Sequence, residues 1–219
     1  MAVSDTTGSA GEGRRSPFVR AWRGLGLTFE DWTTRELVVA AVLSVAVGVV
    51  FWGWGQLWAV TGMDNLFPWS YALVGLWMMG GLLVPYVIRR PGAALYGELV
   101  AAFVSMAMGN KWGFLTMASG AVQGMGAEIV FGLGRWRDFR GVFLYGAAAL
   151  AGVFSILLDT FVYSYYRIYT WNSVLLAAGL IVLSSLVLGG LLAQLLGEAL
   201  AKTGVLSGLA ISKGKVKRI

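Results

Sequence analysis

Three carboxylates, Glu98, Glu128 and Asp159, lie within long apolar stretches of the sequence. An ionisable side chain inside a bilayer costs several kcal/mol unless it faces protein, water or a ligand, so each one is a candidate for function. The sequence contains no His and no Cys, which excludes imidazole bases, thiol nucleophiles and the common zinc sites. We therefore expect Glu98 and Asp159 to bind a cationic or hydrogen-bonding ligand, with no catalysis, metal or cofactor.

Glu98 and Gln123 are predicted to lie at one depth on two neighbouring helices. Glu98 shares its helix face with small residues, which typically pack against other helices. These residues are Ala94, Ala101, Ala102 and Ser105. At a rise of about 1.5 Å per residue, Glu98 lies roughly 18 Å from Asn110, and Gln123 lies roughly 16 Å from Trp112. Asn110 and Trp112 flank the turn between the two helices, so Glu98 and Gln123 reach the same level.

Asp159 adds a third helix to this polar wall. It lies roughly 10 Å from the outer end of its helix. Its face carries Gly152, Ser155, Tyr163 and Tyr166, and the stripe of Gln123 carries Thr116 and Ser119. The wall is therefore predicted to open toward the outside. The alternative for Glu98 and Asp159 is a hydrogen bond between helices, or a buried pair with Lys111 or Arg167.

Trp and Tyr residues cluster toward the same end of the predicted bundle. They are Trp52, Trp54, Trp58, Trp69, Trp112, Tyr163, Tyr165, Tyr166, Tyr169 and Trp171. An aromatic belt at the membrane interface explains most of them. We expect Trp54, Trp112 and Tyr163 to line the site, because aromatic rings beside a carboxylate suit a flat, cationic, hydrogen-bonding ligand.

Glu128 is predicted to be structural. It follows Gln123 by five residues, which turns it about 140° around the helix and toward the cytoplasmic end. A pair with Arg89, Arg90 or Arg135 in the nearby turns explains it. A role in a site or in a coupling surface is the alternative.

A small-residue stripe, formed by Ala40, Ser44 and Gly48, recurs every four residues in the first apolar stretch. Such stripes let membrane helices approach closely. Packing inside the chain and docking of a partner membrane protein are both compatible with the pattern.

Six apolar stretches must position these residues. Hydrophobic residues make up 58% and charged residues 13% of the 219-residue chain, with a mean hydropathy of +0.72, which is typical of a membrane protein. A helix needs about 20 apolar residues to cross roughly 30 Å of hydrocarbon. The predicted spans are 37–60, 69–88, 92–109, 112–133, 141–166 and 173–200. The sequence therefore predicts an all-α integral membrane bundle of six transmembrane helices.

The basic residues predict the orientation of this bundle. All but two of the 17 Lys and Arg residues fall on one side of the topology, and the exceptions are Lys111 and Arg167. Basic residues collect on the cytoplasmic face, so both termini are expected to be cytoplasmic. The net charge of +6 is then an orientation signal and does not indicate a nucleic-acid partner. Residues 1–34 are expected to form a disordered basic tail, 35–201 the six-helix domain and 202–219 a second basic tail.

Four segments of the sequence resemble the YkoE-type substrate-binding (S) component of energy-coupling factor (ECF) transporters. They are RRPGAALYGELVAAF at 89–103, GN at 109–110, AVQGMGAEIVFGLGRW at 121–136 and TGVLSGLA at 203–210. The positions that match the family's motifs are Glu98, Asn110, Gln123, Glu128 and Asp159. The resemblance implies a six-helix S-component fold in the bacterial plasma membrane, with a vitamin bound near the outer face. It also implies a T component and two ATPases as partners.

The resemblance further implies thiamine or its hydroxymethylpyrimidine precursor as the substrate. An aminopyrimidine has donors and acceptors suited to Glu98, Asn110 and Gln123, while a thiazolium cation suits aromatic faces and Asp159. The small-residue stripe then becomes the expected docking seam for the T component. No G-x-x-x-x-G-K-[ST] motif occurs, so ATP hydrolysis is expected in other subunits.

Two other functional classes share parts of this pattern. A self-sufficient secondary transporter or channel for an organic cation is expected to show inverted repeats or broken helices around a midplane site. The sequence shows neither signal. An intramembrane enzyme is disfavoured, because no His, no Cys and no paired Ser/Lys or Asp/Asp spacing is present.

Overall fold

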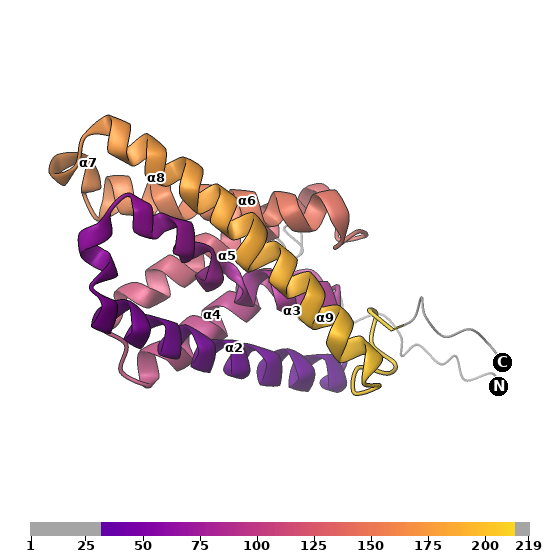
Figure 1. Ribbon diagram of the computed structural model, residues 1–219. Helices are drawn as coiled ribbons and strands as arrows, with labels where there is room; N and C mark the ends of the chain where they lie inside the picture. The colour runs from indigo at the N-terminus through magenta and orange to yellow at the C-terminus, as the bar shows by residue number, and fades with distance from the viewer. Residues whose placement is uncertain (1–31, 213–219) are drawn as a thin grey trace, which may run out of the picture.

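The computed structural model describes residues 32–212, and every regular element in that range is helical (Figure 1). The longer helices are α2 (Thr34–Thr61), α3 (Gly80–Ile88), α4 (Ala93–Ala107), α5 (Leu115–Leu133), α6 (Gly141–Leu157), α8 (Trp171–Ser184) and α9 (Leu192–Lys202). The shorter segments are η2 (Met63–Leu66), η3 (Trp69–Met78), η4 (Leu158–Val162), α7 (Tyr165–Ile168) and η5 (Ser185–Leu191). Three spans are composite, because η3 runs into α3, η4 continues α6, and η5 joins α8 to α9. The predicted all-α, six-helix architecture is confirmed.

Local signals set the ends of the first span. Thr33 and Glu36 form a reciprocal capping box at the start of α2, with the Thr33 amide donating to the Glu36 carboxylate at 2.8 Å. The helix ends at Gly62, which adopts the left-handed conformation at φ +68°. Glu36 also pairs with Arg90 at 3.0 Å, which ties the turn between α3 and α4 to the start of α2.

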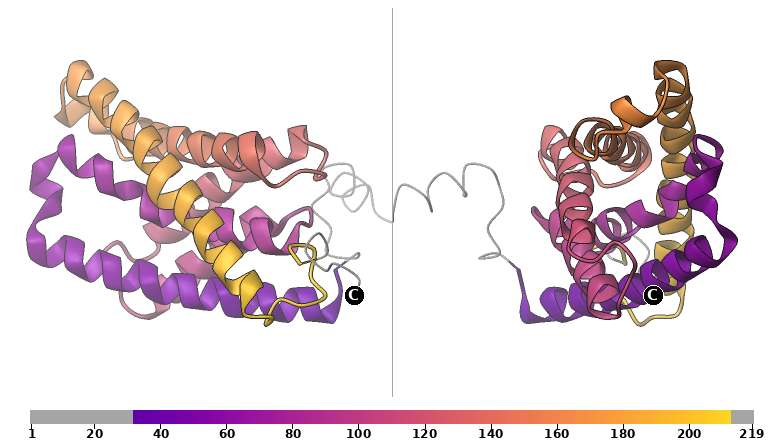
Figure 2. Two further views of the ribbon diagram at one scale, coloured as in Figure 1. Left: turned by 45° about the vertical axis from the view of Figure 1, so that its right-hand side comes forward. Right: turned by 90° about the vertical axis from the view of Figure 1, so that its left-hand side faces the viewer.

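Four spans are long and apolar enough to cross a membrane by length and composition: 34–61, 69–88, 141–162 and 171–202. At 15 residues, α4 is only about 22 Å long, against roughly 30 Å of hydrocarbon. It packs against α2, α3 and α5, as Figure 2 shows. The third predicted span is therefore a short inner helix, and its neighbours carry most of the lipid-facing surface.

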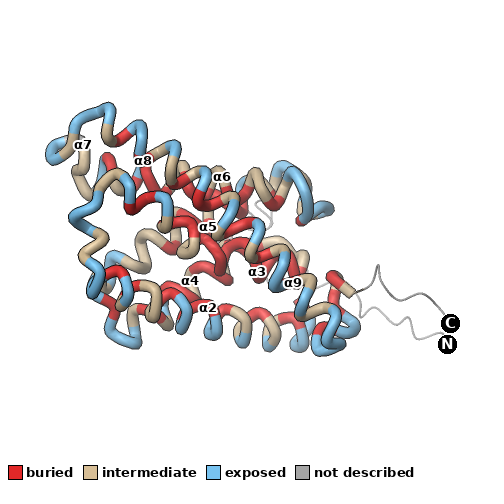
Figure 3. Tube along the Cα trace, viewed as in Figure 1, coloured by how far each residue is buried: buried red, intermediate tan, exposed pale blue. Residues whose placement is uncertain are grey.

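The core and the lipid-facing surface separate clearly in Figure 3. Exposed apolar side chains of α2 and α8 point away from the bundle; they include Val38, Val42, Val49, Leu175 and Leu183. The inner helices approach closely because small residues line their contacts. A Cβ on Gly124 of α5 would lie 3.0 Å from Glu98 Cβ on α4. This close approach holds the Glu98 side chain between α3, α4 and α5.

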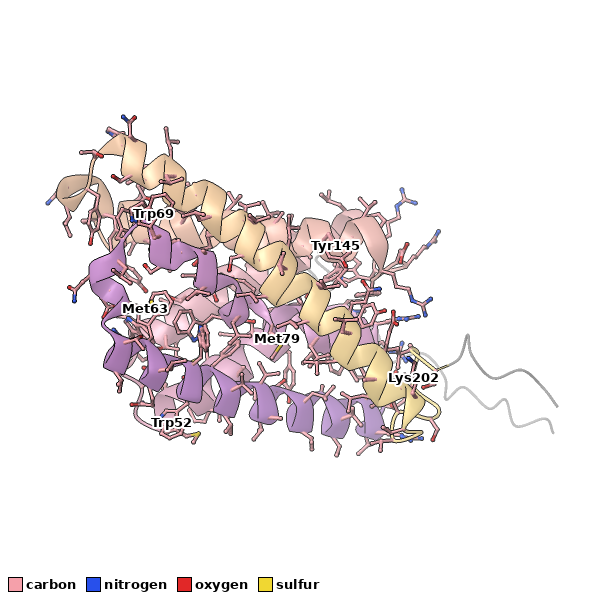
Figure 4. The ribbon with its side chains drawn as sticks, viewed as in Figure 1. Trp52, Met63, Trp69, Met79, Tyr145 and Lys202 are labelled. Carbon is pink, nitrogen blue, oxygen red and sulfur yellow. The ribbon has the colours of Figure 1, made fainter. Side chains whose placement is uncertain are left out.

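The two ends of the bundle differ in content (Figures 1 and 4). The start of α2 and the end of α9, near the labelled Lys202, lie together at what we call the terminal end. The labelled Met63 and Trp69, α7 and the loop between α4 and α5 lie at the opposite, distal end. The predicted tails lie mostly outside the described residues, although Leu206, Leu209 and Ile211 after α9 are buried against the bundle.

The small-residue stripe packs inside the chain. Ala40 and Ser44 are fully buried, and a Cβ on Gly48 would lie 2.6 Å from Val104 Cβ and 2.8 Å from the Ala101 carbonyl oxygen on α4. The stripe therefore forms the seam between α2 and α4. Of the two alternatives, the structure shows packing inside the chain, where α4 covers the stripe. Docking of a T component at these residues stays a prediction.

Candidate functional site

A cavity of about 540 Å³ lies in the distal half of the bundle, within the range of small-molecule sites of roughly 300–1,000 Å³. Its polar lining residues are Asp64, Ser70, Glu98, Ser105, Asn110, Lys111, Thr116, Ser119, Gln123, Ser155 and Asp159. Its aromatic lining residues are Phe51, Trp58, Phe67, Tyr71, Trp77, Trp112, Tyr163, Tyr165 and Tyr169. The fold thus brings six of the seven predicted substrate residues around one cavity, and their contact with a substrate stays a prediction.

Glu98 is the deepest carboxylate of the cavity, with a relative exposure of 1%. Its Oε2 accepts a hydrogen bond of 2.5 Å from the Gly81 amide at the start of α3. Within residues 32–212, its Oε1 accepts no hydrogen bond from the protein. The residue considered as an ion-pair partner, Lys111, instead pairs with Asp64. One carboxylate oxygen is therefore anchored, and the other is available to a ligand.

Gln123 is held in a similar way from the other side of the cavity. Its Nε2 donates a hydrogen bond of 3.0 Å to Ser155 Oγ, which joins α5 to α6. Both residues are buried and line the cavity. This bond fixes the amide plane and leaves the amide oxygen as a second acceptor at the cavity wall.

Asp159 lies in η4, the π-helical continuation of α6, and is anchored by a residue that the sequence did not reveal. The buried hydroxyl of Tyr71 donates a hydrogen bond of 2.6 Å to Asp159 Oδ2. Tyr165 lines the cavity together with Tyr71 and Asp159. Its burial, together with the nearby charge of Asp159, raises the pKa of Tyr165 to about 12. Tyr165 therefore stays protonated at neutral pH and presents a neutral phenol beside the carboxylate.

Tyr163 connects the end of the composite α6–η4 span to α5. Its hydroxyl donates to the Leu115 carbonyl oxygen at 3.2 Å and lies 3.2 Å from Ser119 Oγ. The predicted polar stripe of Ser119 and Gln123 does face the cavity. Tyr163 thus closes the side of the cavity between α5 and η4.

Asn110 lines the cavity, but its polar atoms are used within the chain. Its Oδ1 accepts hydrogen bonds from the Trp112 amide at 3.0 Å, the Gly113 amide at 2.8 Å and Thr116 Oγ1 at 3.0 Å. Its Nδ2 donates to Ser105 Oγ at 3.0 Å. Asn110 therefore positions the loop between α4 and α5, including Trp112, and uses its amide oxygen and one of its two N–H donors within the chain.

Three tryptophans form the aromatic wall of the cavity. Trp77 contacts Trp58 and Trp112 edge to face, with ring centroids 5.0 Å and 5.2 Å apart. Trp54 is absent from the lining residues, and its Nε1 lies 3.3 Å from the Leu73 carbonyl oxygen, to which it donates. Of the two tryptophans predicted to line the site, the structure places Trp112 at the cavity and Trp54 outside its lining.

Tyr71 and Trp77 were missed because their spacing does not fit an α-helix. They lie in η3, a 3-10 helix in which every third residue shares a face. Tyr71, Val74 and Trp77 follow this spacing, and all three line the cavity. A period of three in 69–78 is the signal that an α-helical reading overlooks.

Glu128 lies away from the cavity and caps α4. Its carboxylate accepts hydrogen bonds from the Gly92 amide at 2.7 Å, the Ala94 amide at 3.0 Å and Trp136 Nε1 at 2.6 Å. Backbone donors at the start of a helix favour a negative charge. The structural role is as expected, but among the described residues the Glu128 carboxylate accepts hydrogen bonds from these N–H groups and does not pair with Arg89, Arg90 or Arg135.

Comparison with known proteins gives a consistent family. A family model described as "ABC-type cobalt transport system, permease component" matches residues 35–154. The chain is 35% identical over 193 residues to a protein of Bacillus subtilis (strain 168) named as an HMP/thiamine permease, YkoE; the match covers 86% of this chain and 94% of that protein. A crystal structure described as an S-component of an ECF transporter matches with a TM-score of 0.79 and 33% identity, over 84% of this chain and 93% of that chain.

Sequence and fold therefore agree over most of the chain, and the predicted family resemblance is confirmed. This chain belongs to the YkoE-type S-component family of ECF transporters.

Proposed function

We propose that this chain is the membrane-embedded, high-affinity substrate-binding subunit of an ECF-type importer, and that its cavity binds thiamine or the hydroxymethylpyrimidine precursor. The observation that carries the proposal is the pair of half-anchored carboxylates, Glu98 and Asp159, in one cavity with an aromatic wall. The name of the Bacillus relative supports the same substrate class.

The chemistry of the cavity fits an aminopyrimidine joined to a cation. The free oxygens of Glu98 and Gln123 accept hydrogen bonds from an exocyclic amine deep in the cavity. A thiazolium ring lies against the tryptophan wall and near Asp159, where each cation and aromatic contact contributes about 0.5–2 kcal/mol. The precursor lacks the cation and uses the deep acceptors alone.

A cobalt ion fits this cavity less well, although the matching family model names cobalt transport. Cobalt sites in proteins use clusters of imidazole, thiolate or carboxylate ligands. The sequence has no His or Cys, and the described residues contain no group of three or more His, Cys, Asp or Glu able to hold a metal ion. The aromatic lining favours an organic cation.

Energy for uptake comes from other subunits in this proposal. A T component and two ATPases drive transport, because this sequence has no phosphate-binding loop. The chain lies in the bacterial plasma membrane with both termini in the cytoplasm and the distal end outside. The absence of native Cys permits a single-cysteine test. Asn65→Cys should react with an impermeant maleimide in intact cells and Arg137→Cys should not; the reverse pattern would overturn the orientation.

Binding is tested by titrating the purified protein with thiamine and with hydroxymethylpyrimidine while tryptophan fluorescence is recorded. Trp58, Trp77 and Trp112 line the cavity, so a bound ring should change the emission in a saturable way. Biotin, a vitamin without a pyrimidine or a cation, serves as the control and should leave the emission unchanged. A flat response to both pyrimidine compounds would reject the substrate assignment. Uptake into liposomes by this chain alone would favour a self-sufficient transporter.

A further inference from the structure

Lys111 is the basic residue among the described residues that line the cavity. Its ammonium pairs with the Asp64 carboxylate and lies over the Trp112 ring, 4.7 Å from the ring centroid. A carboxylate and an aromatic face are the two features that recognise an organic cation. The Lys111 ammonium therefore occupies a place where the cationic part of a ligand could bind.

A closed circuit of contacts fixes this arrangement at the distal end. Trp58 Nε1 donates to Asp64 Oδ1 at 2.9 Å. Trp58 contacts Trp77, and Trp77 contacts Trp112, which lies under the Lys111 ammonium. All five residues line the cavity. The circuit keeps the Asp64 carboxylate and the Trp112 face together whether or not the ammonium lies between them.

The ion pair is exposed enough to open. The side chains of Lys111 and Asp64 are 29% and 56% exposed, and ion pairs of this kind add little stability. Lysine also has a long, flexible stem that lets its charged head move into water. Displacement of the ammonium would therefore cost little and would free both the carboxylate and the aromatic face.

We propose that Lys111 is a built-in competitor cation that a cationic ligand must displace, and that it sets the preference of the cavity between cationic and uncharged ligands. The inference rests on the proposed function, because it concerns ligands of the same cavity. A cationic ligand gains the Asp64 carboxylate and the Trp112 face only by moving Lys111 away. An uncharged ligand bound at Glu98 and Gln123 leaves the pair intact.

The test compares the affinities for two ligands in two variants, one that removes the positive charge of Lys111 and one that removes the negative charge of Asp64. Isothermal titration at pH 8 gives the dissociation constants of cationic thiamine and uncharged hydroxymethylpyrimidine for each protein. Lys111→Met should raise the affinity for thiamine relative to the pyrimidine by about threefold to tenfold, as expected for one unit charge near a partly solvated site. Asp64→Asn should lower the same ratio, because the competitor keeps its charge and its counter-charge is lost.

Two controls separate charge at the cavity from other effects. Lys111→Arg keeps the charge and should leave the affinity ratio within about twofold of the wild type. Arg167→Met removes one positive charge from α7 outside the lining of the cavity and should also leave the ratio unchanged. High salt should reduce the effect of Lys111→Met, since the circuit is partly exposed to solvent.

The outcomes distinguish this inference from the proposed function. If the wild type binds neither compound, the proposed function fails and the inference fails with it. If the wild type binds both and Lys111→Met leaves or lowers the ratio, the competitor role alone is wrong. If the ion pair between Lys111 and Asp64 only stabilises the fold, Lys111→Met and Asp64→Asn should lower the affinities for both ligands by the same factor. That result would also overturn the inference.

Discussion

The hydroxyl of Tyr71 donates a 2.6 Å hydrogen bond to Oδ2 of Asp159, a residue 88 positions away. The bond connects η3 to η4 and fixes one oxygen of the carboxylate, so the other oxygen is the one presented to the cavity. The Gly81 amide likewise donates a hydrogen bond to one oxygen of Glu98, Oε2. Glu98 and Asp159 are thus each anchored at one oxygen, which pre-organises them for binding.

Removing the Tyr71 hydroxyl should weaken binding of the cationic substrate. We expect Tyr71→Phe to reduce thiamine affinity about fivefold, since a hydrogen bond of this type contributes about 1 kcal/mol. Titration calorimetry checks the value. Tyr145→Phe is the matched control, because its hydroxyl donates to Gln194 Oε1 at 2.9 Å outside the cavity lining. Equal losses in the two variants would contradict a positioning role for Tyr71.

Substitutions of Glu98 and of Asp159 should have different effects on the two ligands. Glu98→Gln should weaken thiamine and hydroxymethylpyrimidine alike, by about tenfold or more, because one carboxyl oxygen at a buried site is replaced by an amide NH2 group that cannot accept a hydrogen bond. Asp159→Asn should weaken thiamine more than the uncharged pyrimidine. Dissociation constants measured by fluorescence titration give both comparisons.

Glu198→Gln, outside the cavity lining, is the control for this pair and should leave both constants unchanged. If Glu98→Gln or Asp159→Asn aggregates and its folded fraction binds normally, that carboxylate is structural and its place in the substrate site is wrong.

The six helices and the buried carboxylates could be predicted from the sequence. The hydrogen-bond partners of those carboxylates could not. Apolar length and the cost of buried charge identify the spans and Glu98 directly. The bond between Tyr71 and Asp159 depends on the 3-10 geometry of η3, which no α-helical periodicity reveals. The role of Asn110 depends on loop geometry, and the partners of Glu128 depend on how α4 meets α5. Such contacts are tertiary, so residue type and spacing do not determine them.

Glu128 should affect stability and not binding. Glu128→Ala leaves the amides at the start of α4 without their acceptor, which we expect to cost about 1–3 kcal/mol and to lower the Tm of the detergent-solubilised protein. Glu128→Gln keeps one acceptor oxygen and should cost less. Thermal unfolding followed by circular dichroism measures both. An unchanged Tm together with lost thiamine binding would assign Glu128 to the ligand site instead.

Gly48 should be required for the fold of the isolated chain. Gly48→Ala places a methyl group against Val104 Cβ and the Ala101 carbonyl oxygen, and overpacking of this kind costs roughly 1–3 kcal/mol. Gly53→Ala is the matched control on α2, because no atom lies within 4 Å of its added Cβ. Thermal unfolding should separate the two variants. If both keep the wild-type Tm and only Gly48→Ala loses a partner subunit, the stripe is a docking surface after all.

The location of bound thiamine tests the account most directly. A structure determined with thiamine should place the aminopyrimidine within hydrogen-bonding distance of Glu98 and Gln123. It should also place the thiazolium ring between the tryptophan wall and Asp159. Thiamine bound outside the cavity, or bound within it without contact to either carboxylate, would contradict the proposed site.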